Sequence, residues 1–404
     1  MPEGPEVQTI VNGLRALITG LTIEDVSFFD DAARMVSPAS ADELTHALRG
    51  QAVVAVGRRG KFIDIALDSG MHLLIHLMMT GRLLFRDEAY NIARPRFLRC
   101  AIAFAGGAEL CLGDQRKWAM ILYLPAAQID ADSRFRKLGV DVLGDDFTYD
   151  RFRALLTSRR NLHAFLLDQA RLSGLGNIYV NEALFQAGLH PLRAANTLSD
   201  AEAMALYYAI YHVVREAVRQ LGTSFSDYWM PDGTRGEFQN FLYVFQRAGA
   251  PCLRCGAPIE RIGMAGRGAF FCPQDQPLAP PARPPAPPPA DPDALLPNHI
   301  FILKGPEAQP CAALAAHIAA HVPFTQVVET AAADRLAAAL RGGSDALLCV
   351  PDALAAAVVA QHPNAHALAL EAHAPEAALH EAFDAIYAVR CQTPHQHRDA
   401  APAV

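Results

Sequence analysis

The first residues of the chain, Met-Pro-Glu-Gly-Pro-Glu, combine an imino acid with two carboxylates. Removal of Met1 would leave Pro2 with a free secondary amine, whose pKa of ~8 keeps part of it uncharged at neutral pH. Such an amine can attack an electrophilic carbon and form an iminium. Glu3 could then serve as general acid/base, and Glu6 could orient the group. A stiff helix start would produce the same motif, so the terminus alone leaves both interpretations open.

Two glycine-containing segments could receive an anionic ligand. Lys61 follows Gly60 in a turn between two expected strands, where its ammonium group could meet a phosphate or only solvent. Gly174-Leu175-Gly176 opens an expected helix, and glycines there let backbone N–H groups approach a phosphate closely. Asn177 at the helix start could cap the helix or donate to that phosphate. A purely structural helix-turn-helix remains the alternative.

Three of the eight cysteines are clustered near position 260. Cys252 and Cys255 have C-x₂-C spacing, and Cys272 follows after sixteen residues. This spacing is typical of one half of a tetrahedral zinc site, and a second C-x₂-C pair would complete it. Asp275 stands where the fourth cysteine is expected. The cluster predicts one structural Zn²⁺ whose fourth ligand is open, against a metal-free β-hairpin, and Arg267 lies between its two halves.

Composition indicates a multidomain globular protein. The chain has 404 residues, 51% of them hydrophobic, and a net charge of −7. Residues 277–404 contain 6 Lys+Arg and 12 Asp+Glu, so they carry −6 and leave −1 on residues 1–276. Such a near-neutral body can bind a polyanion if its cations gather on one face. Without a run of 18 apolar residues or a secretory signal, we expect no membrane span and a cytoplasmic location.

The sequence before residue 277 divides into three segments with different patterns of apolar residues. Residues 1–130 begin with a helix from Glu6 to about Thr19 and continue with short strand-like runs, which favours a β-sandwich or flattened barrel. Residues 148–221 have helical periodicity and are assigned to a second domain over residues 131–238, and residues 239–276 return to short strands. Examples of the strand-like runs are 51–59, 61–67, 71–79, 99–105 and 109–114. The expected helices are 149–158, 162–172, 178–188 and 200–220.

A proline-rich segment, residues 277–297, predicts a semi-rigid linker, or else a docking ligand. After it, strand-like runs alternate with Ala-rich helical ones, which predicts a small α/β domain over residues 298–390, followed by a tail at 391–404. This region contains neither a dinucleotide-binding nor a P-loop motif, so its role and partner are unknown. The expected strands are 300–304, 325–330, 345–350 and 365–370, and the expected helices are 311–322, 334–341 and 352–362.

In this order the motifs of residues 1–276 resemble the formamidopyrimidine-DNA glycosylase / endonuclease VIII family. The resemblance implies an α+β multidomain fold: an N-terminal β-sandwich catalytic domain, a helix–two-turn–helix domain and a zinc-finger β-hairpin. It implies that Pro2 is the Schiff-base nucleophile and Glu3 the proton donor. It also implies that Lys61 touches lesion and phosphate, and that the phosphate contacts are His76, Asn177 and Arg267.

Base flipping requires side chains that fill the vacated space. The family uses a Met and an Arg–Phe pair, and the matching segments here are His-Leu-Met-Met-Thr-Gly and Asp-Gln-Arg-Lys-Trp-Ala. The resemblance therefore implies that Met79, Arg116 and Trp118 form the wedge. Arg116 would also read the orphaned base.

The resemblance implies a bifunctional enzyme, a DNA-formamidopyrimidine glycosylase and DNA-(apurinic or apyrimidinic site) lyase, in base excision repair. Its substrates would be 8-oxoguanine and formamidopyrimidines in double-stranded DNA, and we expect a nucleoid-associated monomer. The alternatives are an endonuclease VIII-like enzyme for oxidised pyrimidines, or a catalytically silent damaged-DNA binder. His163 and Ser226 stand where the family pattern has lysines, and Gln115 replaces a proline.

Overall fold

The computed structural model describes residues 2–225, 228–264, 266–278, 300–305, 318–319, 325–328, 345–351, 365–368 and 375–392, and positions 315 and 322. Ser226, most of the linker and nearly all of the three Ala-rich segments lie outside the described residues. The chain divides into two compact units. The sandwich unit holds residues 1–146, 168–176 and 214–239, and the helical unit holds 147–167, 177–213 and 240–404.

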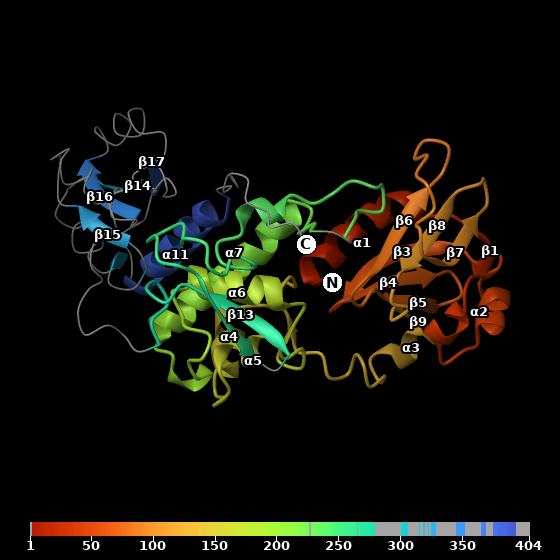
Figure 1. The fold of residues 1–404 in the computed structure, drawn as a ribbon, viewed down its shortest axis with the longest axis horizontal. Helices are drawn as coiled ribbons and strands as arrows, with labels where there is room; N and C mark the ends of the chain where they lie inside the picture. Colours follow the sequence, from red (N-terminus) through yellow and green to blue (C-terminus); the bar gives the residue numbers. More distant parts are fainter. Residues whose placement is uncertain are drawn as a thin grey trace. The chain divides into compact units, whose positions relative to one another are not determined.

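The sandwich unit contains two sheets, a four-stranded one in the order β1-β7-β8-β6 and a five-stranded one in the order β2-β9-β5-β4-β3 (Figure 1). Apolar side chains from both sheets share one core with the helix α1 (Gly4–Ile18), which packs on β3 and β4. The strands are β1 (Ile23–Phe28), β2 (Val36–Ser37), β3 (Val53–Arg59), β4 (Phe62–Leu67), β5 (Met71–His76), β6 (Gly81–Arg86), β7 (Leu98–Phe104), β8 (Glu109–Asp114) and β9 (Met120–Pro125).

The predicted β-sandwich is confirmed, and the expected strand-like runs correspond to β3, β4, β5, β7 and β8. The strands β1, β2, β6 and β9, and the helix α2 (Ala41–Leu48), lie outside the runs that were named as examples from the sequence. In β1 every third residue is buried, so its burial period is not that of a flat strand. The short helix α3 (Ala126–Ile129) follows β9.

One helix prediction was wrong. Residues 162–172 form only the short helix α5 (Leu162–Leu166), after which Leu172–Ser173 forms β11, paired in parallel with β10 (Val140–Asp141). The carboxylate of Asp168 accepts a hydrogen bond from the Ala170 N–H, and its carbonyl accepts from Arg171 and Leu172. An aspartate that bonds its own following backbone favours a turn over helix continuation.

The helical unit contains α4 (Tyr149–Leu155), α5 and α6 (Asn177–Gln186). The long helix α7 (Asp200–Arg219) begins in this unit and ends in the segment assigned to the sandwich unit. The hairpin of β12 (Glu260–Met264) and β13 (Arg267–Phe271) follows, and its base shares an apolar cluster with α6 and the clustered cysteines. Short 3₁₀ turns occur at Ala32–Met35, Ala195–Thr197 and Phe238–Phe241.

After the linker, four strands form a parallel sheet in the order β15-β16-β14-β17. They are β14 (Ile300–Gly305), β15 (Thr325–Val328), β16 (Asp345–Pro351) and β17 (Ala365–Leu368), at the positions that the pattern predicted. A helix that the pattern did not predict, α11 (Pro375–Gln392), ends two residues beyond the expected domain boundary at 390. No helix among the described residues is long and apolar enough to cross a membrane.

Candidate functional site

The N-terminal residues are buried at the start of α1. Glu3 is the N-cap residue and is 2% exposed, and its backbone N–H donates to Glu6 Oε2 at 2.8 Å. Pro5 occupies the first turn, where its missing N–H costs nothing. The other carboxylate oxygen of Glu6 accepts the Thr223 N–H at 2.8 Å. Glu6 therefore fixes the segment that contains Pro2 and Glu3 to the loop at Thr223.

The turn Gly174-Leu175-Gly176 packs directly against this terminus. The Gly4 N–H donates to the Gly174 carbonyl at 2.8 Å. A Cβ atom at Gly176 would overlap the carboxyl group of Glu3, and a Cβ at Gly4 would lie 2.7 Å from the Gly174 oxygen. Gly174 also has φ +94°, a conformation that L side chains rarely adopt. The glycines are thus required for close approach to the terminus.

Lys61 contacts the same turn. Its ammonium group donates to the Leu175 carbonyl at 2.6 Å, and Gln169 donates to that carbonyl at 2.8 Å. The β3–β4 turn that carries Lys61 is held by Arg58, which forms a bidentate ion pair with Asp141 at 2.7 and 2.8 Å and donates to the Gly60 carbonyl. The Arg58 side chain is 6% exposed and the Asp141 side chain 25%, so the guanidinium is shielded from water and the carboxylate only in part.

His76 lies at the end of β5 as a neutral imidazole. Burial lowers its pKa to about 4, and the charge of Lys61 acts in the same direction. The Met78 N–H donates to His76 Nδ1 at 3.0 Å, so the ring proton is assigned to Nε2. The edge of Phe62 packs on the ring. His76 can therefore offer one N–H donor without a positive charge.

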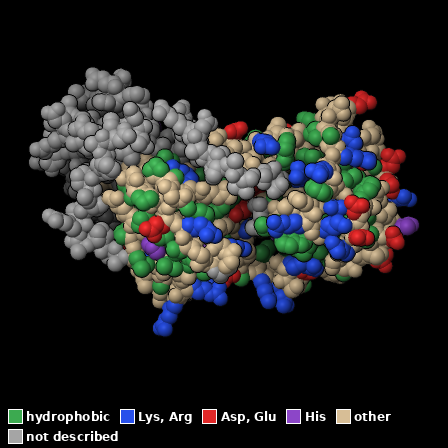
Figure 2. All heavy atoms as spheres, in the orientation of Figure 1, with side chains coloured by type: hydrophobic (Ala, Val, Ile, Leu, Met, Phe, Trp, Pro, Cys, Tyr) green, Lys and Arg blue, Asp and Glu red, His purple; other side chains and the backbone are tan. Residues whose placement is uncertain are grey.

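The three residues predicted to form the wedge, Met79, Arg116 and Trp118, stand on two neighbouring loops of the sandwich unit, which are called the wedge loops below. Met79 is 37% exposed and Trp118 is 51% exposed, so both side chains reach solvent. The Arg116 guanidinium lies over the Trp118 ring, 5.2 Å from its centroid. Figure 2 shows that Lys and Arg side chains recur among hydrophobic ones on the described surface in this view.

One buried carboxylate holds both wedge loops. Asp114 is 1% exposed and accepts the Thr80 hydroxyl at 2.5 Å, on the loop of Met79. The same carboxylate accepts backbone N–H groups of the other loop, from Arg116, Trp118 and Ala119, at 3.1, 2.6 and 2.8 Å. Asp114 thereby fixes the backbone and leaves the wedge side chains to project.

A second constellation lies in the helical unit, where α6 faces β13. Asn177 donates through Nδ2 to the Gly268 carbonyl at 3.0 Å, and Asn181, one turn on, accepts the Phe270 N–H at 2.6 Å. These two bonds hold the hairpin against the helix. Arg267, the first residue of β13, is exposed beside them.

His163 orients Asn177. Its Nε2 lies 2.9 Å from Asn177 Oδ1, and since Nδ2 of that amide already donates to Gly268, the histidine is the donor. Burial lowers the pKa of His163, and the charge of Arg267 acts in the same direction, against the hydrogen bond to Asn177. A neutral histidine thus stands where the family pattern has a lysine. It is hydrogen-bonded to Asn177, which is one of the predicted phosphate contacts.

Glu182 joins α6 to the segment that leads to the cysteine cluster. The carboxylate is 1% exposed and accepts the backbone N–H groups of Tyr243, Val244 and Phe245 at 2.7, 3.0 and 2.8 Å. Burial raises its pKa, and the three hydrogen bonds oppose that rise. This arrangement fixes the direction in which the chain enters the hairpin.

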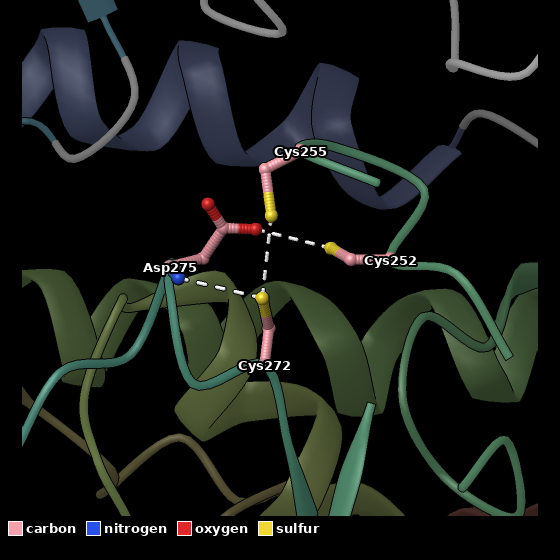
Figure 3. Close-up of side chains that lie close together, drawn as sticks. All are labelled: Cys252, Cys255, Cys272 and Asp275. Atoms are coloured by element: carbon pink, nitrogen blue, oxygen red, sulfur yellow. Dashed lines mark hydrogen bonds between the residues drawn. The ribbon is translucent and has the colours of Figure 1, made fainter. Parts of the chain in front are cut away.

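Cys252, Cys255, Cys272 and Asp275 point toward one another (Figure 3), and their ligand atoms all lie within 4.8 Å. The Cys252 Sγ–Asp275 Oδ2 distance is 3.0 Å and the Cys255 Sγ–Cys272 Sγ distance is 3.4 Å. Such separations suit a tetrahedral ion with bonds of about 2.0–2.3 Å. Burial and the neighbouring Cys252 raise the pKa of Asp275 to about 7, which shows how poorly water solvates this carboxyl. These donors fit a structural zinc.

A sandwich with a proline-bearing buried terminus, a helix–two-turn–helix domain and a zinc hairpin defines a class of DNA-repair glycosylases. Family models match each part: the formamidopyrimidine-DNA glycosylase N-terminal domain over residues 1–121, its H2TH domain over 138–228, and the zinc finger found in FPG and IleRS over 249–278. The chain belongs to the formamidopyrimidine-DNA glycosylase family, which confirms the predicted resemblance.

Relatives and solved structures agree. The chain is 40% identical over 278 residues to the formamidopyrimidine-DNA glycosylase of Heliobacterium modesticaldum, covering 68% of this chain and 100% of that one. The MutM (Fpg) protein of Thermus thermophilus matches with 38% identity and a TM-score of 0.61, over 69% and 100% of the chains. A mutant of the Lactococcus lactis FPG protein, in complex with DNA containing Fapy-dG, matches with 31% identity and a TM-score of 0.63, over 68% of this chain and 100% of that one.

The structure groups the predicted residues into separate sets. Within the sandwich unit, Glu3 and Lys61 meet at the glycine turn. The loops that carry the three predicted wedge residues are both hydrogen-bonded to Asp114. Asn177 lies beside β13, which begins at Arg267, in the helical unit. Sequence reasoning missed Asp114, Arg58 and Asp141, because a lone buried carboxylate or ion pair has no motif. Asp114 is the last residue of β8 and the first residue of the Asp-Gln-Arg-Lys-Trp-Ala segment, which was the one available signal.

Proposed function

We propose that the chain excises oxidised purines from duplex DNA through Pro2 and then cleaves the strand at the resulting site, acting as a monomer. The observation that carries this proposal is the packing of the Glu3 carboxyl group against Gly176, on the turn that Lys61 also contacts. The packing supports the proposal because the Glu3 carboxyl, next in sequence to Pro2, and the Lys61 ammonium group meet at one turn. The family membership reported above supports the same activity.

In the proposed reaction, the Pro2 nitrogen loses its proton and forms a bond to C1′, and the bond from C1′ to the base breaks, so that the base leaves with a proton. The C1′–O4′ bond then breaks, with Glu3 supplying a proton to O4′, and the opened sugar is held as an iminium between C1′ and the Pro2 nitrogen. The resulting iminium acidifies the neighbouring C2′ hydrogen. Loss of that proton breaks the C3′–O bond (β-elimination), and a second elimination breaks the C5′–O bond (δ-elimination). The product is a one-nucleotide gap with phosphates at both ends. The chemistry requires that Met1 be removed, because an acylated proline nitrogen is not a nucleophile.

For recognition, we propose that Met79, Arg116 and Trp118 fill the space of the flipped nucleotide. Their exposed side chains on a rigid mount suit insertion into a base stack. Lys61, His76, Asn177 and Arg267 would bind phosphates. Figure 2 shows that basic side chains are present on the described surface although residues 1–276 are nearly neutral overall.

We further propose that Asp275 is the fourth ligand of the zinc, and that the parallel sheet after the linker belongs to a small α/β domain. The Asp275 carboxylate oxygen is already 3.0 Å from the Cys252 sulfur, in reach of an ion shared by both. The strand order and parallel pairing of β14 to β17 support the α/β assignment.

Borohydride trapping tests the chemistry. Duplexes bearing 8-oxoguanine opposite cytosine, a formamidopyrimidine or thymine glycol are incubated with the full chain and with Pro2→Gly, and covalent adducts and nicks are measured. We expect the wild-type chain to be trapped and to cut the 8-oxoguanine duplex fastest, and Pro2→Gly to do neither. Binding without trapping would indicate a silent DNA binder. Since the Lactococcus lactis protein has also been solved with an oxidised pyrimidine in DNA, preferential cutting of thymine glycol would indicate the pyrimidine alternative.

A further inference from the structure

The helix α11 buries one whole face. Ala382, Phe383, Ile386 and Tyr387 are each 0% exposed, at the three- and four-residue spacing of a helical stripe. Glu381 and Asp384 lie on the exposed side. A helix with this pattern is stable only when its apolar face packs against another part of the protein. The contacts of α11 within the helical unit show which parts these are.

The first contacts are with α7, beside which α11 lies in Figure 1. The Tyr208 ring stacks on Phe383, with centroids 5.9 Å apart and planes at 15°. The Tyr208 hydroxyl lies 3.0 Å from His380 Nδ1, and His212 Nε2 lies 2.9 Å from Asp384 Oδ1. The hydrogen bond from His212 lowers the pKa of Asp384. Apolar stacking and polar contacts thus alternate along the interface.

The second set of contacts is at the end of α6. The Tyr387 hydroxyl donates to the Gln186 carbonyl at 3.1 Å, one of the last carbonyls of α6, which lack a partner within the helix. The Tyr243 hydroxyl donates to the Arg390 carbonyl of α11 at 3.4 Å. α11 therefore supplies a hydrogen-bond donor to a carbonyl at the C-terminal end of α6. It also accepts a hydrogen bond from Tyr243, in the segment that follows α7.

Arg254, between two of the cysteines, meets the same junction. Its guanidinium donates to Gln186 Oε1 at 2.7 Å and lies over the rings of Phe185 and Tyr243, 5.0 and 5.5 Å from their centroids. α6, the Tyr243 segment, the cysteine cluster and α11 thus form one packed group. The other end of α6 is Asn177, which holds β13.

We infer that α11 is an internal brace of the helical unit, through which the extension after the proline-rich linker fixes α6 and the zinc hairpin. The part of this inference that concerns DNA affinity rests on the proposed function, because it takes Asn177 and Arg267 as phosphate contacts. The family similarity covers 68% of the chain, so α11 is an addition of this protein to the matched part. Tyr208 and Tyr243 belong to the surface that α11 covers, so this interaction surface is occupied by a helix of the same chain.

The brace is tested first without DNA. A protease recognition sequence is placed in the linker of the full chain, the folded protein is cut, and the products are separated by size under native conditions. The two fragments should elute together, because the α11 contacts do not depend on the peptide connection. Elution as separate species would overturn the inference. Phe383→Asp in the same cleavable chain should cause separation, whereas Glu381→Lys, an exposed position on the same helix, should not.

DNA affinity is tested next, with a duplex containing a tetrahydrofuran abasic analogue that cannot be cleaved by the proposed chemistry. Tyr387→Phe removes only the hydroxyl group that reaches Gln186, and should weaken binding roughly threefold to fivefold at unchanged zinc content. Glu381→Asp, which keeps the negative charge at this exposed position of α11, is the control variant. If the wild-type chain does not bind this duplex, the proposed function fails while the cleavage result still stands. If wild type and Tyr387→Phe bind equally, the coupling of α11 to the phosphate contacts is refuted.

Discussion

The carboxyl group of Glu3 occupies the space that the Cβ of any larger residue at position 176 would need. The two positions are far apart in sequence, yet each restricts the other: the glycine permits the close approach, and the acid fills it. The N-terminal segment and the glycine turn therefore depend on each other's packing, and a substitution in one should disturb the other.

Gly176→Ala should displace Glu3 and impair base excision. A methyl group at this position has no room beside the carboxyl, so Glu3 loses its orientation as proton donor. Because positioned acid/base groups contribute about 10²–10⁴ in rate, we expect single-turnover excision to fall about 100-fold or more. Gly57→Ala is the control, since a Cβ there meets nothing within 4 Å. Equal loss in both variants would mean that the close packing is irrelevant.

Asp114→Asn should loosen both wedge loops. The amide NH₂ replaces an acceptor of backbone N–H groups, which leaves buried donors facing a donor and costs about 2–3 kcal/mol. Unfolding in urea measures this loss, and the fluorescence of exposed Trp118 should change at the same time. Asp68→Asn, on an exposed turn, is the matched substitution. Unchanged stability of Asp114→Asn would show that the carboxylate does not carry the loops.

His163→Leu should weaken binding to abasic-analogue DNA roughly fivefold to tenfold, because Asn177 loses the donor that sets its amide. If the histidine acts only through Asn177, the double variant His163→Leu/Asn177→Ala should bind no worse than Asn177→Ala alone. His163→Gln keeps an N–H donor and should recover part of the affinity. Strict additivity of the two substitutions would contradict this link.

The stability of the folded chain should fall as pH falls from ~6.5 toward 4, in part because of His76. The unfolded histidine binds a proton near pH ~6.5 and the folded one only at about 4, so acid favours the unfolded chain. The loss from this group is at most about 3 kcal/mol. His76→Gln removes the titrating group, so the difference between its unfolding free energy and that of wild type should change over this pH range. A constant difference would refute the assignment.

Zinc removal should unfold the hairpin around Cys252, Cys255 and Cys272. Metal analysis of the purified chain should give one zinc, and a chelator should remove it with loss of structure. Asp275→Cys should retain zinc more strongly during chelator competition, and Asp275→Ala should release it sooner. If all three forms release zinc at the same rate, Asp275 is not a ligand.

The sequence predicted the elements whose signals are local. The C-x₂-C motif, the glycine turn and the apolar runs of β3 to β5 each depend on neighbouring residues, and these were found. The Asp168 turn inside an apolar helical pattern was not, since the apolar period outweighed one side-chain hydrogen bond. The role of Asp114 and the packing of α11 on α6 and α7 could not be predicted, because they depend on contacts between residues distant in sequence.

In the loop after β8, Asp114 accepts hydrogen bonds from backbone N–H groups and not from the side chains that project from that loop. Every residue except proline supplies such a group, so the identity of the projecting side chains at 116 and 118 is decoupled from the integrity of their support. A library of exchanges at these two positions could therefore explore new preferences for the opposing base without forfeiting the scaffold, which makes this loop the natural place to re-engineer the protein.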